Sequence, residues 1–228
     1  MPVVTIAVGP LQANCHLAWR EGSRNALIVD AGGEADAIAR ELEARILEPE
    51  VLFSTHGHVD HVAANAGLKQ RFPAMKLAIL REERETLMRP THNLSFFVGG
   101  TLEPPEPDIL LDDGDTLSVG GMSFRVIHVP GHTVGGAALF GEIDSRPVVF
   151  TGDTLFAGGI GRSDFPGGDG AALVAAIRER LLALPDDTVV YSGHGPQTTV
   201  AHEKSSNPFL AEDADASGHE DVHGVASP

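Results

Sequence analysis

Short apolar runs alternate with amphipathic segments along most of the chain. Short apolar runs bounded by turn residues are typical of strands, whereas apolar residues repeating every three or four positions are typical of helices. This alternation predicts an α/β fold. Strands are expected at 3–8, 16–19, 26–29, 51–54, 76–80, 116–119, 123–129, 137–140, 148–151 and 188–191. Helices are expected at 35–46, 62–72, 173–184 with Asp169 as N-cap, and 198–204.

Two segments lack this pattern. Residues 89–110 are rich in proline and glycine and predict a long loop with one helical turn around 94–98. Long loops in compact domains are often lids or binding loops. From residue 211 onward no periodicity is visible. We therefore expect one catalytic domain over 1–210, followed by an acidic disordered tail over 211–228.

Composition and charge narrow the class of protein. The chain is 42% hydrophobic and carries a formal net charge of -16, which argues against a nucleic-acid partner. Cys15 is the only cysteine, so it can form no intramolecular disulfide, and we expect it to be a small buried hydrophobe. The N-terminus lacks the basic residues of a secretory signal, and no apolar run approaches the roughly 20 residues that span a bilayer. The expectation is a soluble cytoplasmic protein without a membrane partner.

The densest chemical signal lies where the strand at 51–54 ends and a helix begins. His56, His58, Asp60 and His61 place four potential metal ligands within six residues. Imidazole and carboxylate together suit zinc, iron or manganese better than calcium or magnesium. Alternate residues of a compact turn can point the same way, so His56 and His58 can serve one metal. Asp60 and His61, on the first turn of the helix, would face a neighbouring position.

Three later strands each end in one ligand-type residue, namely His132, Asp153 and His194. Each follows a glycine, which permits close backbone approach around a crowded centre. Loops at strand ends are a common place for functional groups. Taken singly, each residue has an ordinary structural explanation as a turn or loop residue. Together with the first cluster they predict a metal centre.

An HxHxDH motif followed by separate His, Asp and His ligands resembles the metallo-β-lactamase superfamily, and the resemblance runs from about residue 3 to residue 210. It implies an αβ/βα four-layer sandwich with the metals at one edge. It also implies two divalent metal ions, with zinc expected and iron or manganese also accepted by this ligand set. By that resemblance the first metal is held by His56, His58 and His132, the second by Asp60, His61 and His194, and Asp153 bridges them.

Within the superfamily, the segments at 11–15, 152–156 and 161–165 look like the glyoxalase II group, in its short hydroxyacylglutathione hydrolase-like form. The chain ends soon after residue 210, where classical glyoxalase II carries a further helical domain, so we expect a single-domain member. The implied activity is hydrolysis of a small-molecule thioester, such as S-lactoylglutathione, to a hydroxy acid and a free thiol. A metal-activated hydroxide would be the nucleophile. The catalytic residues would be Asp60, which can orient that hydroxide, and Asp153.

Three residues and one loop are candidates for substrate binding. Arg162 has a planar fork suited to bidentate contact with a carboxylate, and a structural ion pair with Asp164 is the alternative explanation. Phe156, Phe165 and the loop at 94–98 are expected to line the acyl or thiol pocket.

A second activity remains open. Persulfide dioxygenases share this fold and a similar segment at 161–165, but use one iron held by two histidines and one aspartate. Here those ligands would be His56, His132 and Asp153. A lactonase or another hydrolase of the fold is a further alternative. The sequence predicts no oligomeric state.

Overall fold

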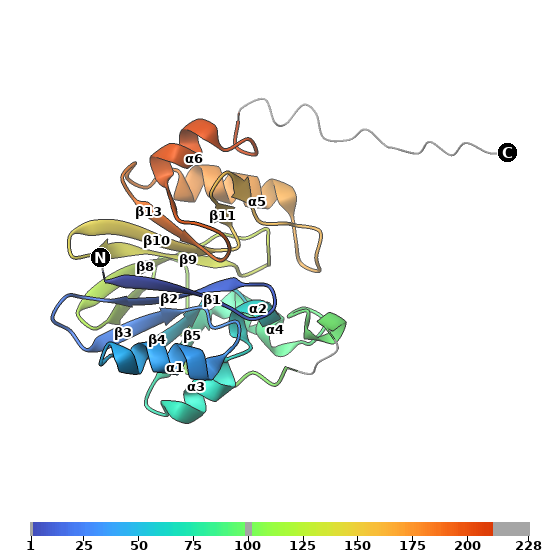
Figure 1. Ribbon diagram of the computed structural model, residues 1–228. Helices are drawn as coiled ribbons and strands as arrows, with labels where there is room; N and C mark the ends of the chain where they lie inside the picture. Colours follow the sequence, from blue (N-terminus) through green and yellow to red (C-terminus); the bar gives the residue numbers. More distant parts are fainter. Residues whose placement is uncertain (1, 99–101, 212–228) are drawn as a thin grey trace.

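Two six-stranded sheets lie face to face in the computed structural model, with helices on their outer sides (Figure 1). The structure describes residues 2–98 and 102–211. This arrangement confirms the four-layer α/β sandwich expected from the sequence. The acidic tail predicted over 211–228 lies, beyond Ala211, outside the described residues.

The first sheet has the order β1-β2-β3-β4-β5-β6, with antiparallel pairing up to β3 and parallel pairing after it. Two helices, α1 (Ala35–Ala44) and α3 (Asn65–Arg71), cover its outer face and bury Ile38, Leu42 and Leu68 there. The strands are β1 (Val3–Val8), β2 (Ala13–Trp19), β3 (Asn25–Val29), β4 (Glu48–Ser54), β5 (Lys76–Leu80) and β6 (Ile109–Leu111).

The second sheet has the order β14-β13-β10-β9-β8-β7. Its outer face is covered by α5 (Gly170–Ala176), the π-helical segment η3 (Ile177–Leu181) and α6 (Val200–Ser206). Because β9 is antiparallel to both neighbours and β13 is parallel to β10, strands β8, β10 and β13 all end at the same edge. The strands are β7 (Thr116–Val119), β8 (Met122–His128), β9 (Ala137–Ile143), β10 (Arg146–Gly152), β13 (Val189–Ser192) and β14 (Thr198–Thr199).

The main core lies between the sheets. Alternation along β8 sends Phe124 and Val126 inward and Arg125 outward, as the two-residue period of a strand requires. Phe53, Phe124 and Phe150 are completely buried there. Burying a side chain of this size contributes about 1.5–3 kcal/mol. The packed sheets therefore form a stiff base for the loops at their edge.

Some elements differ from the sequence expectation. In place of the single helix expected over 62–72, the structure has two short helices, α2 (Val59–Val62) and α3. The helical hydrogen-bond pattern breaks between them, because the Ala64 amide donates to the Ala31 carbonyl at 2.8 Å. The segment after β5, left without an element, forms η1 (Arg81–Glu83) and α4 (Arg84–Met88). Strand β6 overlaps the end of the loop predicted at 89–110, and its pairing with β5 is what defines it as a strand.

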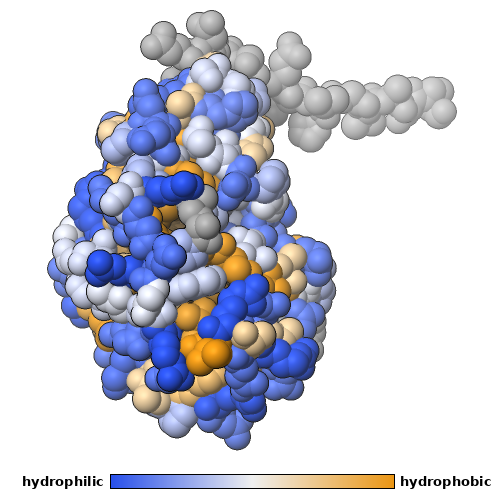
Figure 2. All heavy atoms as spheres, turned by 60° about the vertical axis from the view of Figure 1, so that its left-hand side comes forward, coloured by the Kyte–Doolittle hydropathy of each residue, from blue (hydrophilic) through white to orange (hydrophobic). Residues whose placement is uncertain are grey.

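Other details agree with the sequence. The turn expected around 94–98 is the 3-10 helix η2 (Ser95–Val98). Asp169 caps α5, with its side chain accepting from the Ala172 amide. The face in Figure 2 is mostly hydrophilic with scattered hydrophobic patches, which is ordinary for a globular surface. No helix among the described residues is both long and apolar enough to cross a membrane.

Candidate metal centre

All seven ligand-type residues predicted from the sequence meet at one edge of the sandwich. His56 and His58 follow β4, and Asp60 and His61 lie on α2 directly after them. The other three follow the ends of β8, β10 and β13. A hydrogen bond from the Ala137 amide to the Thr55 carbonyl, 2.9 Å long, ties the two sheets together beside the cluster. Residues up to 138 positions apart in the chain thus share one site.

His56, His58 and His132 form a first set, in which one ring nitrogen from each residue lies within 4.8 Å of the other two. His132 Nε2 and His58 Nδ1 are 3.0 Å apart. Two nitrogens bound to one tetrahedral zinc lie roughly 3.3 Å apart. The observed separation therefore suits a shared ion.

Asp60, His61 and His194 form a second set with the same mutual limit of 4.8 Å. His194 Nε2 lies 3.4 Å from Asp60 Oδ2. Asp153 lies between the two sets, with Oδ1 3.3 Å from His61 Nε2, and with Oδ2 3.8 Å from His132 Nε2 and 3.6 Å from His194 Nε2. One carboxylate can thus reach both positions.

Hydrogen bonds orient three of the histidines. The Nδ1 of His61 lies 2.9 Å from Asp30 Oδ2, and the Nδ1 of His132 lies 2.7 Å from the Arg162 carbonyl oxygen. The Nδ1 of His56 lies 3.1 Å from the hydroxyl of Thr55, which itself donates to Asp30. With Nδ1–H donating in each case, a neutral ring would present the lone pair of Nε2 to a bound cation. Metal-binding histidines characteristically have this kind of support.

Four buried atoms of the cluster have no hydrogen-bond partner among the described residues. A buried polar atom left in this way costs free energy, which a bound cation would offset. These atoms are the Nε2 of His56, His58 and His61, and Oδ1 of Asp153. A cation would offset this cost at His56, His61 and Asp153, whereas His58 faces His132 with its Nδ1, so its Nε2 would not bind the same ion. The donor set fits a divalent zinc, iron or manganese ion.

The pKa values of the clustered side chains are shifted by burial and by their charged neighbours. Burial and His132 lower the pKa of His58 to about 3, so its ring is neutral at physiological pH. Burial opposes ionisation of Asp153, but His61, His132 and His194 hold the pKa of its carboxyl below the ordinary value. Burial also opposes charge on His61, yet Asp153 and Asp30 raise its pKa well above normal. Metal binding at His61 would therefore release a proton.

A pocket of about 470 Å³ opens above the cluster. Apolar side chains form much of its wall, among them Leu11, Leu94, Phe97, Phe165 and Pro166. Phe165 packs edge-on to His58, with ring centroids 5.8 Å apart, and the Arg162 guanidinium lies over the Phe165 ring at 4.0 Å. Nε and Nη2 of Arg162 each donate to Asp164 at 2.6 Å, so the ion pair offered above as the alternative for Arg162 is present.

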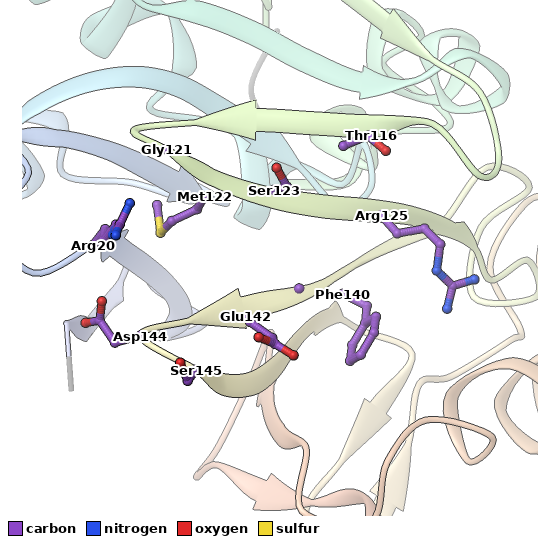
Figure 3. Close-up of a pocket in the computed structure, with 11 residues that line it drawn as sticks. Arg20, Thr116, Gly121, Met122, Ser123, Arg125, Phe140, Glu142, Asp144 and Ser145 are labelled. Carbon is purple, nitrogen blue, oxygen red and sulfur yellow. The ribbon is translucent and has the colours of Figure 1, made fainter.

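A wider opening of about 800 Å³ lies on the outer face of β7, β8 and β9 (Figure 3). Arg20, Asp144 and Ser145 lie at one end of it, and Arg125 and Phe140 at the other. The side chains spread along the strands instead of converging, and none of the candidate metal ligands lines it. This opening is larger than the pocket above the metal cluster, but it lacks the candidate ligands, so we do not assign it as the reactive site.

Several residues that hold the ligand loops were missed by sequence reasoning. Asp30 directly follows β3, just as the candidate ligands follow the ends of their strands. The search for polar residues at strand ends could therefore have identified it. Asn14 lies in the segment 11–15, and its Nδ2 donates to the carbonyls of Ser192 and Gly195 at 2.9 Å on either side of His194. The sequence did not predict a role for Glu83, because it lies in a run of acidic and basic residues that is typical of a solvent-exposed surface.

Residues 8–194 match the family described as the Metallo-beta-lactamase superfamily. The chain belongs to that superfamily. A relative from Haemophilus influenzae, Hydroxyacylglutathione hydrolase GloC, is 39% identical over 211 residues, covering 92% of this chain and 98% of the relative. The protein is a metallo-hydrolase of this superfamily, as the names of its relatives and its ligand-type cluster indicate.

Three solved structures superpose over nearly the whole chain. The BLEG-1 B3 metallo-beta-lactamase has a TM-score of 0.85 at 35% identity and covers 91% of this chain and 99% of its own. TTHA1623 in a di-iron-bound form has a TM-score of 0.76 at 33% identity, covering 91% and 100%. ETHE1 from Myxococcus xanthus has a TM-score of 0.75 at 26% identity, covering 95% and 86%.

Proposed function

We propose that this protein is a cytoplasmic thioester hydrolase of the glyoxalase II type, acting on S-lactoylglutathione or a similar thioester with two divalent metal ions. The observation that carries the proposal is the position of Asp153 between two three-ligand sets at the base of an apolar pocket. The similarity to a hydroxyacylglutathione hydrolase supports the thioester substrate. Zinc is the proposed metal, although a similar protein is known in a di-iron form. The proposed ligands are His56, His58, Asp60, His61, His132, Asp153 and His194.

Bound divalent ions would acidify water and polarise the thioester carbonyl. Asp60 then holds the attacking water at its carboxylate and accepts a hydrogen bond from it. Its side chain is 15% exposed and lines the pocket, whereas His61 is fully buried. Asp153 supplies the anionic charge shared by both sets. Thiolate is a good leaving group, so the site needs no strong general acid.

Arg162 and Phe165 are proposed to contact the substrate at the pocket wall. Phe165 offers a flat apolar surface beside His58 for the part of the substrate next to the carbonyl. Two of the three guanidinium nitrogens of Arg162 are engaged with Asp164. A bidentate contact with a substrate carboxylate would therefore use the Nη1–Nη2 edge, beside the negative charge of Asp164, or would require Asp164 to move away.

The deciding experiment measures hydrolysis of S-D-lactoylglutathione by purified, metal-replete protein, followed by loss of thioester absorbance. We expect turnover that a chelator abolishes and added zinc restores. Failure to hydrolyse this or other thioesters, with metal bound, would overturn the proposal.

The second candidate is a mononuclear iron persulfide dioxygenase using His56, His132 and Asp153. These three side chains also lie together, with His132 Nε2 3.8 Å from Asp153 Oδ2, and the likeness to ETHE1 leaves this candidate open. Metal content separates the two. Two metals per chain with thioesterase activity favour the hydrolase, whereas one iron with oxygen consumption favours the dioxygenase.

A further inference from the structure

Glu83, the last residue of η1, is completely buried and lies against two of the loops that carry ligands. Its Oε1 accepts a hydrogen bond of 2.9 Å from the Gly57 amide, and its Oε2 accepts one of 2.8 Å from the Gly135 amide. Gly57 lies between His56 and His58, and Gly135 follows His132 by three residues. A single carboxylate therefore joins the loop after β4 to the loop after β8.

Both loops pack directly on the backbone of the segment 81–88. A Cβ added at Gly57 would lie 2.5 Å from the Leu87 amide nitrogen, and one at Gly135 would lie 2.3 Å from the Glu83 amide nitrogen. No side chain fits between these surfaces. The two loops belong to different sheets, so Glu83 connects the two halves of the sandwich at the site.

A carboxylate is suited to this position because both of its oxygens accept and neither donates. Glutamine would satisfy one amide and point its own N–H group at the other. Burial raises the pKa of Glu83 to about 7, and the hydrogen bonds from Gly57 and Gly135 oppose that rise. Burying a carboxyl group at this position costs free energy, so we expect Glu83 to have a specific role.

We propose that Glu83 is a positioning residue for the first ligand set, holding the two loops at the distance where His58 and His132 share one ion. The inference rests on the metal centre of the proposed function. The second set has separate supports, since Asp30 contacts His61 and Asn14 binds the loop of His194. Glu83 therefore acts mainly on one of the two metal positions.

The test compares zinc binding by the wild-type protein and by Glu83→Gln in competition with a chromophoric chelator. We expect one of the two zinc dissociation constants to rise about 10–100-fold, which is the usual cost of losing an outer partner, while the other stays nearly constant. Circular dichroism of the chelated variant checks that it is folded. Thioesterase activity is a secondary readout only.

Glu203 provides a matched control. It is equally buried and accepts from the Gly158 amide at 3.0 Å and from Asn207 Nδ2 at 2.7 Å, and it hydrogen-bonds neither Gly57 nor Gly135. Glu203→Gln should lower thermal stability and leave both zinc dissociation constants unchanged.

A folded Glu83→Gln protein with unchanged zinc binding overturns the inference while leaving the proposed function intact. Equal weakening of both sites, or the same pattern in Glu203→Gln, also overturns it. If Glu83→Gln does not fold, Glu83→Asp is used, whose carboxylate falls short by about 1.5 Å, and the same outcomes decide. A wild-type protein that binds no metal overturns both the inference and the proposed function.

Discussion

Asp30 Oδ2 lies 2.9 Å from His61 Nδ1, and both side chains are buried beneath the metal cluster. The same carboxylate accepts from the amide and the hydroxyl of Thr55 at 2.8 Å. Asp30 thus orients His61 directly and His56 through Thr55. Asp30 and Glu83 therefore both contact the ligand loop after β4, Asp30 at Thr55 and Glu83 at Gly57.

Asp30→Asn should weaken zinc binding most at the second set, by about 10–100-fold, because an amide supports the His61 ring less well than a carboxylate. The effect on the first set should be smaller, since Asp30 reaches His56 only through Thr55. Asn tolerates the positive φ of 57° at this position, so the backbone is not strained by the change. The two-site zinc titration measures the effect, and exposed Asp36→Asn is the control. Unchanged binding in a folded Asp30→Asn protein would contradict this role.

His58→Ala should remove a proposed ligand of the first set. We expect loss of bound metal and a fall in kcat/KM of more than about 100-fold, beyond the cost of losing an outer partner. Metal analysis and thioester hydrolysis measure it, with the exposed His202→Ala as control. If activity and metal content both survived, the whole site assignment would fail.

Acid should destabilise the fold through His16. Burial lowers the pKa of His16 to about 4. Its neutral ring forms hydrogen bonds with Thr5 Oγ1 at 2.9 Å and with the Ser192 carbonyl at 3.1 Å. The unfolded state takes up a proton near pH 6.5 and the folded state only near pH 4, so the contribution is complete above pH 6.5 and is lost as the pH falls toward 4. The loss is on the order of 3 kcal/mol. Denaturant unfolding of chelated protein between pH 4 and 7 should show a shallower pH dependence in His16→Gln, and equal slopes would refute the assignment.

Cys15 should resist thiol reagents in the folded protein. Burial, reinforced by Asp30, raises the pKa of its thiol far above the ordinary value. Thiolate is the reactive form, so labelling requires unfolding. A chromogenic disulfide reagent should react in denaturant and not in buffer, and fast labelling of native protein would show that the strand β2 opens.

Arg162→Ala should raise KM about tenfold for a thioester bearing a carboxylate and leave kcat little changed, since one charged contact is worth on the order of 1–2 kcal/mol. Asp164→Asn, which releases the guanidinium, should lower the same KM. If both variants shift only thermal stability, the Arg162–Asp164 pair is structural. An uncharged thioester serves as the control substrate.

The sequence alone predicted the seven candidate ligands and the order of the elements that carry them. Strand periodicity placed His132, Asp153 and His194 at strand ends, and the density of His56, His58, Asp60 and His61 was visible without a structure. Local hydrophobic pattern suffices for this, because strands and helices of this fold each bury a face that is recorded in their own residues.

Only the tertiary structure decided which groups support the ligands. The helix pair at 81–88, strand β6, and the contacts of Glu83, Asn14 and Asp30 depend on partners distant in the chain, as in the pairing of Glu83 with Gly57 and Gly135. The residues next to a polar side chain in the sequence do not show which distant donor it will bind when the two sheets pack together. Burial of Glu83 follows from the packing of both loops upon it, so its role can be inferred only from the folded chain.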